Sequence, residues 1–171
     1  MKLRMTSAVF AVTAMGLLAS AGSAVSQPKS LKDQLVGTWT VTAWEQTYPD
    51  GKKDQAFGSS PKGINTFSAD GRFIAIFLRP DLPKIASGDR VKPTPDEAMA
   101  VAKGSIVYYG TYTVNEADKS VSLNLEGTSY TNQIGLPQKR IITSISASEL
   151  KYENPRSTSG GQIRVALTRA K

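Results

Sequence analysis

Residues 36–48 read Val-Gly-Thr-Trp-Thr-Val-Thr-Ala-Trp-Glu-Gln-Thr-Tyr, and this stretch decides which fold the chain is expected to adopt. Most of it consists of β-branched and aromatic residues, which favour strands. From Trp39 to Ala43 every second residue is apolar and threonines stand between, as in a strand with one buried face. The stretch therefore predicts a long, half-buried strand, and Glu45 falls in phase with its buried face.

Seven further stretches with strand character follow. Residues 63–68 and 72–79 flank Ala69-Asp70-Gly71, and Asp-Gly accepts the positive φ angles of a tight hairpin turn. Residues 72–79 are apolar at both phases of the alternation, which predicts a strand covered on both faces. The other strands are expected at 105–115, 120–128, 138–146, 150–154 and 162–169.

Eight antiparallel strands in a meander can stack as a sandwich or close into a barrel. Closure removes the sheet edges that would otherwise pair with other chains. We therefore predict an all-β fold, an eight-stranded antiparallel up-and-down β-barrel, which is just wide enough to hold one small ligand. Residues 25–171 are expected to form this single domain.

One short helix is expected between the third and fourth strands. Thr94-Pro95-Asp96-Glu97 combines a capping Thr, a Pro at the first helical position and a Glu three residues after the cap, and Gly104 follows as a stop. Because a helix of about two and a half turns is not stable alone, we expect it to pack on the doubly apolar strand 72–79. Residues 27–32 are interpreted as a polar lead-in.

The N-terminus has the order of a secretory signal. Basic residues are followed by an apolar run from Ala8 to Leu18 and by small residues at 19–24. The apolar run is shorter than the roughly 20 residues of a spanning helix, which favours a removed signal over a membrane anchor. Cleavage after Ala24 or after Ser26 fits equally well. We expect an exported protein, periplasmic or secreted, with residues 1–24 as its signal peptide.

The composition excludes several classes of site. The chain has no cysteine and no histidine, which excludes a disulfide framework, a thiolate nucleophile, a Ser-His-Asp triad, a His-ligated haem and nearly all zinc sites. We expect no metal and no other cofactor.

The charge is basic but scattered. The formal net charge is +7, and removal of the signal takes two of the 21 basic residues and none of the 14 acidic ones, which leaves about +5. Lys52-Lys53 and Lys139-Arg140 are the only adjacent basic pairs in the sequence, whereas a nucleic-acid binder clusters such charge. We interpret the basic residues as a solvated surface and expect no nucleic-acid partner, while attraction to an anionic ligand stays open.

Several motifs carry a family resemblance. Gly37-Thr38-Trp39 resembles the Gly-x-Trp motif of lipocalins. From about Leu31 to the C-terminus the chain is similar to the bacterial and fungal lipocalin-like domain family, whose fold is a calycin-type β-barrel. The similar stretches are Pro61-Lys62-Gly63, residues 68–73, Arg79-Pro80-Asp81 with residues 86–90, residues 110–114, and Glu126-Gly127 with Asn132, Gly135 and Gln138. The resemblance implies a barrel with a pocket and a helix between the third and fourth strands.

The resemblance also implies how one end of the barrel closes. In lipocalins the Trp of the motif closes the barrel floor, and an Arg on the last strand packs across its ring. Trp39 takes the place of that Trp. Arg169 and Arg164 are the candidates for the Arg, and Arg169 is favoured because it ends the last expected strand.

Six aromatic side chains share the face expected to point inward. They can line a ligand pocket, or they can fill the barrel as core. Core is favoured for Trp39, and the two interpretations are close for Tyr108 and Tyr112, whose hydroxyl groups need partners if buried. The six are Trp39, Phe67, Phe73, Phe77, Tyr108 and Tyr112.

Charged residues are candidates for the polar end of a ligand or for proton transfer. A buried Glu45 would need a cation or would have a raised pKa, but an open mouth or a bulge that turns it outward is favoured. Glu126 has an outward phase and is kept for its place in the family motif. Arg79 can grip a carboxylate or phosphate. For Arg79, Asp81, Asp89 and Arg90 alike, however, ion pairs that hold the loop across the barrel mouth are favoured.

Three functions stay open. The favoured one is an exported barrel that binds a small hydrophobic or amphipathic molecule of unknown identity. The second is an enzyme, such as an isomerase or cyclase, that acts on a small apolar substrate in the same pocket through Glu45, Glu126, Tyr108 or Arg79. The third is a packed structural barrel without a ligand. No catalytic residue is assigned, and the oligomeric state is not determined by the sequence.

Overall fold

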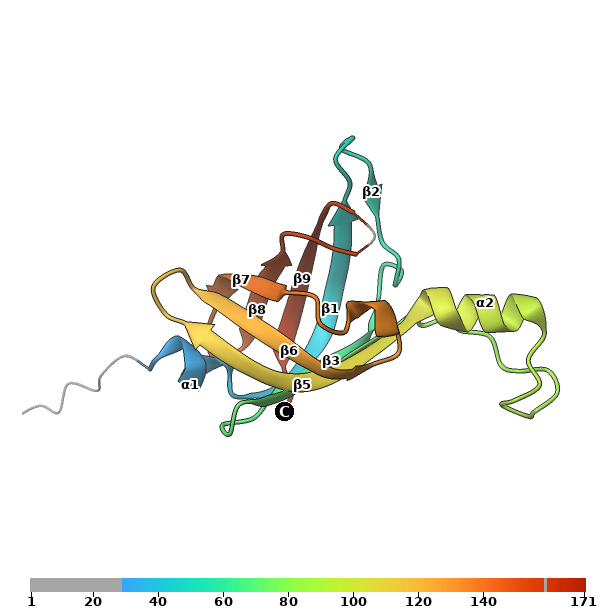
Figure 1. Ribbon diagram of the computed structural model, residues 1–171, viewed down its shortest axis with the longest axis horizontal. Helices are drawn as coiled ribbons and strands as arrows, with labels where there is room; N and C mark the ends of the chain where they lie inside the picture. Colours follow the sequence, from blue (N-terminus) through green and yellow to red (C-terminus); the bar gives the residue numbers. More distant parts are fainter. Residues whose placement is uncertain (1–28, 159) are drawn as a thin grey trace, which may run out of the picture.

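The computed structural model describes residues 29–158 and 160–171, so the expected signal peptide lies outside the described residues. Strands dominate this part of the chain, and they curl into a barrel (Figure 1). The elements are α1 (Leu31–Leu35), β1 (Gly37–Thr47), β2 (Lys53–Asp54), β3 (Lys62–Phe67), β4 (Arg72–Leu78), α2 (Pro95–Gly104), β5 (Ser105–Asn115), β6 (Ser120–Thr128), the 3-10 helix η1 (Thr131–Gln133), β7 (Gln138–Ile145), β8 (Glu149–Asn154) and β9 (Gln162–Arg169).

The sheet is antiparallel and closes on itself. From β3 onward each strand pairs with the next along the chain, and β1 pairs with β3. The first and last strands pair from Trp39 opposite Arg169 to Thr47 opposite Gln162, which closes the wall. β2 adds a two-residue pairing to the end of β1. The prediction of an eight-stranded up-and-down barrel, with the helix between its third and fourth wall strands, is confirmed.

The first strand changes its inward face halfway along. Its register against β9 shifts between Val41 and Ala43, which marks a β-bulge. On one side of the bulge Val41 is buried, and on the other Trp44 and Gln46 are buried while Ala43 is exposed. The prediction that Ala43 and Glu45 point inward is therefore wrong. The extra residue of the bulge exchanges the inner and outer faces for every residue after Val41.

A helix that the sequence did not predict, α1, covers the barrel end at which β1 begins. Ser30 Oγ accepts a hydrogen bond from the backbone N–H of Asp33 at 3.0 Å and caps the helix. The backbone N–H of Leu31 donates to the carboxylate of Glu116 at 2.9 Å, and Leu31 and Leu35 are buried. The prediction of a polar lead-in is wrong from Leu31 onward. A five-residue helix shows no period in the sequence and depends on its contacts with the barrel.

The second helix begins as predicted but lies elsewhere. Thr94 Oγ1 accepts from the backbone N–H of Glu97, whose carboxylate accepts from the N–H groups of Thr94 at 2.7 Å and Ala86 at 2.8 Å. These bonds tie the preceding loop to the helix, and both project from the side of the barrel (Figure 1). Met99 is 54% exposed, and the outward residues of β4 are only half-buried. The prediction that this helix packs on β4 is therefore wrong.

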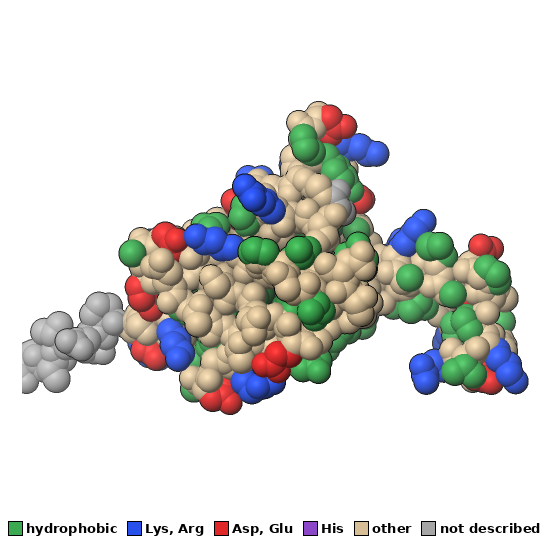
Figure 2. Space-filling model, viewed as in Figure 1, with side chains coloured by type: hydrophobic (Ala, Val, Ile, Leu, Met, Phe, Trp, Pro, Cys, Tyr) green, Lys and Arg blue, Asp and Glu red, His purple; other side chains and the backbone are tan. Residues whose placement is uncertain are grey.

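The surface carries both charges, and the core lies inside the barrel. On the face shown in Figure 2, basic and acidic side chains lie interspersed rather than gathered by sign. None of the helices among the described residues is long and apolar enough to cross a membrane. The buried apolar side chains of the wall strands form one cluster with Leu31 and Leu35 of α1. A ligand inside the barrel therefore needs space that the side chains of this core do not fill.

Candidate ligand site

A tryptophan and an arginine close the barrel end beneath α1. Trp39 is fully buried, and its indole N–H donates to the carbonyl of Leu35 at 2.8 Å. The Cζ atom of Arg169 lies 4.0 Å from the centre of the Trp39 ring. Arg169, rather than Arg164, therefore takes the place expected from the resemblance. Its guanidinium also donates to three backbone carbonyls, those of Ala147 at 2.7 Å, Gln34 at 2.8 Å and Val36 at 2.9 Å.

Gly37 makes room for this arginine. Its φ angle is 133°, in a region that L side chains rarely adopt. A Cβ atom at this position would lie 2.5 Å from Arg169 Nη1, which is closer than van der Waals contact permits. Two features of this chain therefore require glycine at the first position of the Gly-x-Trp motif: the backbone angle and the space that the guanidinium occupies.

Three of the aromatic residues proposed as ligand contacts pack against one another above this floor. The ring of Phe67 lies 6.4 Å from that of Phe73 and 5.2 Å from that of Tyr112, centre to centre. The Tyr112 hydroxyl donates to the carbonyl of Ser68 at 2.9 Å, and burial raises the pKa of this tyrosine. None of the three lines the cavity at the other end of the barrel, which is described next. Phe67, Phe73 and Tyr112 are therefore core residues, which corrects their prediction as ligand contacts.

A cavity of about 270 Å³ occupies the other end of the barrel. Phe77 and Tyr108 line it, as the sequence predicts for an inward face. Trp44 lines it too and packs edge-on against Phe57, with ring centres 5.0 Å apart. Small-molecule pockets of about 300–1,000 Å³ have such walls, mostly apolar with a few polar groups. The apolar lining consists of Trp44, Ala56, Phe57, Phe77, Ile106, Tyr108, Ile163 and Val165, with Tyr152 and several polar side chains beside them.

Arg140 brings a positive charge into this cavity. Along β7, the side chains of Gln138, Arg140 and Ile142 are all buried, and Arg140 is 7% exposed. Its guanidinium donates to the carbonyl of Lys139 at 3.0 Å and to the side-chain oxygen of Gln138 at 3.4 Å. The interpretation of the Lys139-Arg140 pair as surface charge is wrong for Arg140, because successive residues of a strand point to opposite faces.

Arg140 lies at the inner end of the cavity. Together with Tyr108 and Tyr152 it also lines a space of about 10 Å³ that lies among Phe67 and Phe73, toward the floor. The same three side chains therefore form the boundary between the packed half of the barrel and the hollow half.

Two buried polar side chains accompany Arg140 at this boundary. The side-chain amide of Asn65 donates to the Tyr152 hydroxyl at 2.8 Å, and the buried Asn65 Oδ1 accepts no hydrogen bond from the described residues. Burial raises the pKa of Tyr152 far above its ordinary range, with a further contribution from Tyr108, while Arg140 and Asn65 offset part of the rise. Tyr152 therefore stays protonated, and its hydroxyl can donate.

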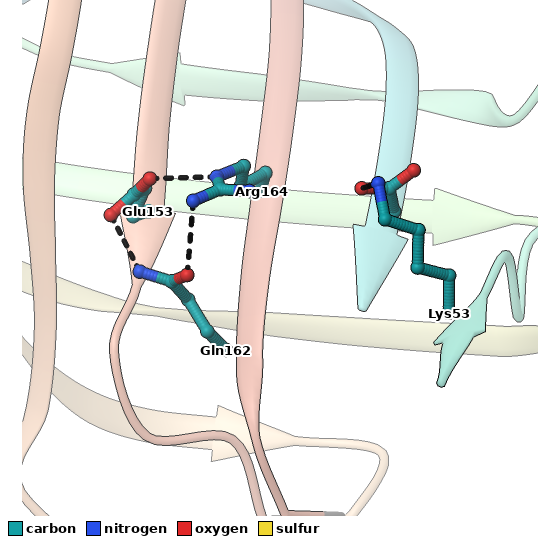
Figure 3. A network of polar contacts seen from close by, with 5 residues as sticks. Lys53, Glu153, Gln162 and Arg164 are labelled. Carbon is teal, nitrogen blue, oxygen red and sulfur yellow. Dashed lines mark hydrogen bonds and ion pairs between the residues drawn. The ribbon is translucent and has the colours of Figure 1, made fainter. Parts of the chain in front are cut away.

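Glu45 does not reach the cavity. Its carboxylate lies 3.0 Å from Lys53 Nζ on the outer face, because the bulge in β1 turns it outward. On the same face, Arg164 donates to Glu153 at 2.8 Å and to Gln162 at 3.2 Å (Figure 3). The outward turn at a bulge, which the sequence favoured for Glu45, is what the structure shows, so its role as a ligand contact gains no support. These ion pairs link neighbouring strands instead.

Arg79 does not meet the cavity either. It forms a two-pronged ion pair with Asp81, with distances of 2.9 Å and 2.7 Å, and both side chains are exposed. The hydrogen bonds from Arg79 lower the pKa of Asp81. The structure thus shows the ion pair that the sequence favoured for Arg79 and gives no support to its role as a ligand contact, because Asp81 occupies its fork.

The remaining charged candidates have separate surroundings. Asp89 lies 3.5 Å from Lys92 within the loop, and Glu126 lies 2.7 Å from Arg72 outside the barrel, in keeping with its outward phase. Arg90 lines a mostly apolar groove between α2 and the barrel mouth. The structure thus does not bring the charged candidates together.

Apart from Phe77 and Tyr108, sequence reasoning missed the side chains that line the cavity, among them Arg140, Trp44, Gln46 and Tyr152. The alternation in β7 carried a signal for Arg140, which is in phase with buried Ile142, but the neighbouring Ile141 is equally apolar and leaves the phase undecided. The bulge that turns Trp44 and Gln46 inward leaves no trace in the pattern of residue types.

Comparisons with known proteins find one family and several solved barrels. The family model of the lipocalin-like domain matches residues 36–171. A lipocalin-like protein from Bacteroides uniformis is similar in structure, with a TM-score of 0.43, 16% identity, and coverage of 80% of this chain and 99% of that one. A redesigned β-barrel also has a TM-score of 0.43, with 14% identity and coverage of 83% and 96%. No curated protein matches the chain.

Proposed function

The chain belongs to the lipocalin-like domain family, and from that premise we propose that it is an exported protein that binds a small hydrophobic or amphipathic molecule inside the barrel. The observation that carries this proposal is the cavity of about 270 Å³ with its aromatic and aliphatic wall. Burial of a ligand's apolar surface against such a wall is the main driving force for binding. Export, to the periplasm or the medium, is proposed from the order of residues at the N-terminus.

The groove beside α2 supports an entry route from that side. Phe57, Lys103 and Ile106 line both the groove and the barrel cavity, so the two hollows adjoin. Val101 and Tyr130, which line the groove, are both exposed at the surface. An apolar molecule can therefore contact protein before it reaches the interior, with α2 as one rim of the mouth.

The site gives no support to an enzyme that uses the acidic residues considered from the sequence. Glu45 and Glu126 both form ion pairs outside the barrel. Among the described residues that line the cavity, Asp54 is the one carboxylate, and it is exposed. A general acid or base needs to be within hydrogen-bond reach of the substrate. The binding function is therefore favoured.

The proposal is tested by filling the cavity. N-phenyl-1-naphthylamine, a neutral dye that fluoresces in apolar surroundings, serves as the probe. We expect the wild-type protein to bind it, and Ile163→Trp to weaken binding about tenfold or more because the new ring occupies the cavity and clashes with the dye. Ile64→Trp is the matched control, because Ile64 lies on β3 with 37% of its surface exposed and does not line the cavity.

Two results would oppose the proposal. A wild-type protein that gives neither a fluorescence rise nor a shift in melting temperature with the dye has no accessible pocket. Equal losses in Ile163→Trp and Ile64→Trp would show that the dye binds elsewhere. The protein for this test is recovered from the exported fraction, where a mature N-terminus at Val25 or Gln27 supports export and a retained Met1 contradicts it.

A further inference from the structure

The guanidinium of Arg140 lacks an anionic partner within the described part of the chain. No carboxylate in residues 29–158 and 160–171 lies within 4.0 Å of it, whereas Arg72, Arg79 and Arg164 each pair with one on the surface. Its hydrogen-bond partners are all neutral: one backbone carbonyl, one side-chain amide oxygen at 3.4 Å, and the hydroxyl of Tyr152. A buried cation with neutral partners alone is costly, and an anion in contact with it offsets much of that cost.

From this arrangement we propose that the ligand is an amphipathic anion, with an oxyanion head such as a carboxylate bound by Arg140 and an apolar body that lies against Trp44 and Phe77. The inference deepens the proposed function and rests on it. It adds the chemical class of the ligand and its direction in the barrel, with the head toward the floor and the body toward the mouth.

The groups around Arg140 suit such a head. A guanidinium presents a planar fork of N–H donors that matches a carboxylate, and charge-assisted bonds of this kind are strong. The Tyr152 hydroxyl accepts from Asn65 and from Arg140, and its own O–H group is a further donor. Gln138, which also lines the cavity, carries a side-chain NH₂ group as a further donor. Three neighbouring residues thus present donors to one region.

The rest of the cavity suits an apolar body and opposes a second buried charge. Trp44, Phe77 and Val165 are buried apolar residues of its wall. The acidic Asp54 lies on β2 and is exposed, so water screens its repulsion of an anion. Lys103, also exposed, lines the cavity from the end of α2 and adds a positive charge. The charges of the site therefore favour an anion over a cation.

The test compares three ligands that share one chain: octanoate, 1-octanol and octylammonium. Each displaces N-phenyl-1-naphthylamine from the wild-type protein in a competition titration at neutral pH. We expect octanoate to compete about 10- to 100-fold more tightly than 1-octanol, the difference that one charge-assisted hydrogen-bond pair contributes, and octylammonium to compete least. Without a buried cation the order of the first two reverses, because burial of an unpaired carboxylate is costly.

Arg140→Met removes the cation and keeps an unbranched apolar side chain. In this variant we expect octanoate to lose its advantage and 1-octanol to compete as in the wild type or better. Arg164→Met is the matched control, since it removes one positive charge from the outer face and should leave the octanoate preference unchanged. Arg140→Lys keeps the charge without the fork, so its preference for octanoate should be intermediate.

The outcomes separate the two proposals. If the dye does not bind the wild-type protein, the proposed function and this inference both fail. If the dye binds and 1-octanol competes as well as octanoate, the barrel is a binding protein for neutral molecules and the inference is overturned. The wild-type titration decides this without any variant, so a failure of Arg140→Met to fold does not affect the conclusion. Loss of the octanoate preference in Arg164→Met would place the anion on the surface and also overturn it.

Discussion

Two arginines of the barrel, one at its floor and one at the inner boundary of the cavity, have different surroundings. At the floor, Arg169 covers Trp39 and donates to three backbone carbonyls at 2.7–2.9 Å. At the boundary of the cavity, Arg140 has one carbonyl at 3.0 Å and the side-chain oxygen of Gln138 at 3.4 Å. Arg169 thus has three short hydrogen bonds to the backbone, whereas Arg140, which also contacts the Tyr152 hydroxyl, has one such bond and lines the cavity.

The floor and the mouth end of the barrel differ in how tightly their side chains pack. At the floor, Arg169 covers Trp39 and occupies the space that a side chain at Gly37 would need. At the mouth end, aromatic side chains surround a space, and a charge is buried without a counter-charge from the described residues. On this account the floor contributes stability, and the ligand binding that we propose for the mouth end comes at a cost in stability.

The two tryptophans give the largest expected effect. Trp39 is fully buried in the packed floor, so Trp39→Ala should lower the free energy of unfolding by about 3–5 kcal/mol. Trp44 already borders a cavity, so Trp44→Ala should cost about 1–2 kcal/mol less, because fewer packed atoms lose their neighbours. Urea denaturation followed by circular dichroism measures both changes. Equal losses at the two sites would mean that the mouth end is packed like the floor.

Replacement of either arginine by methionine should change the free energy of unfolding less than Trp39→Ala does, and the two replacements should differ from each other. Arg169→Met should cost about 2 kcal/mol, because it removes the contact with Trp39 and leaves three carbonyls without their donor. Arg140→Met in ligand-free protein should change the free energy of unfolding by less than about 1 kcal/mol or raise it, because an apolar side chain replaces a poorly paired buried charge. A loss at Arg140 as large as that at Arg169 would identify Arg140 as structural.

The floor was predictable from the family resemblance, whereas only Phe77 and Tyr108 of the cavity lining were predicted as ligand contacts. The resemblance to lipocalins implied that Trp39 closes the floor and that an arginine of the last strand covers it, and the structure identifies this arginine as Arg169. The hairpin around Asp70-Gly71 and the capping box of α2 were likewise visible, because specific residue types are required at those places.

Most of the cavity lining could not be predicted, because it depends on the strand register after a bulge and on contacts between distant segments. One extra residue between Val41 and Ala43 exchanges Glu45 for Trp44 and Gln46 on the inner face, and alternation alone cannot show such a bulge. The position of α2 depends on hydrogen bonds with its own preceding loop, which the helical period does not report.

The central claim, that the mouth end binds a ligand while the floor stays closed, is tested most directly by the indole resonances of the chain's two tryptophans, Trp39 and Trp44. Nitrogen-15 spectra of wild-type protein, assigned with the Trp44→Phe variant, are recorded as octanoate is added. We predict that the Trp44 indole signal shifts with saturation, while that of Trp39, hydrogen-bonded to Leu35, does not move. A shift of the Trp39 signal, or binding that leaves the Trp44 signal in place, would contradict the account.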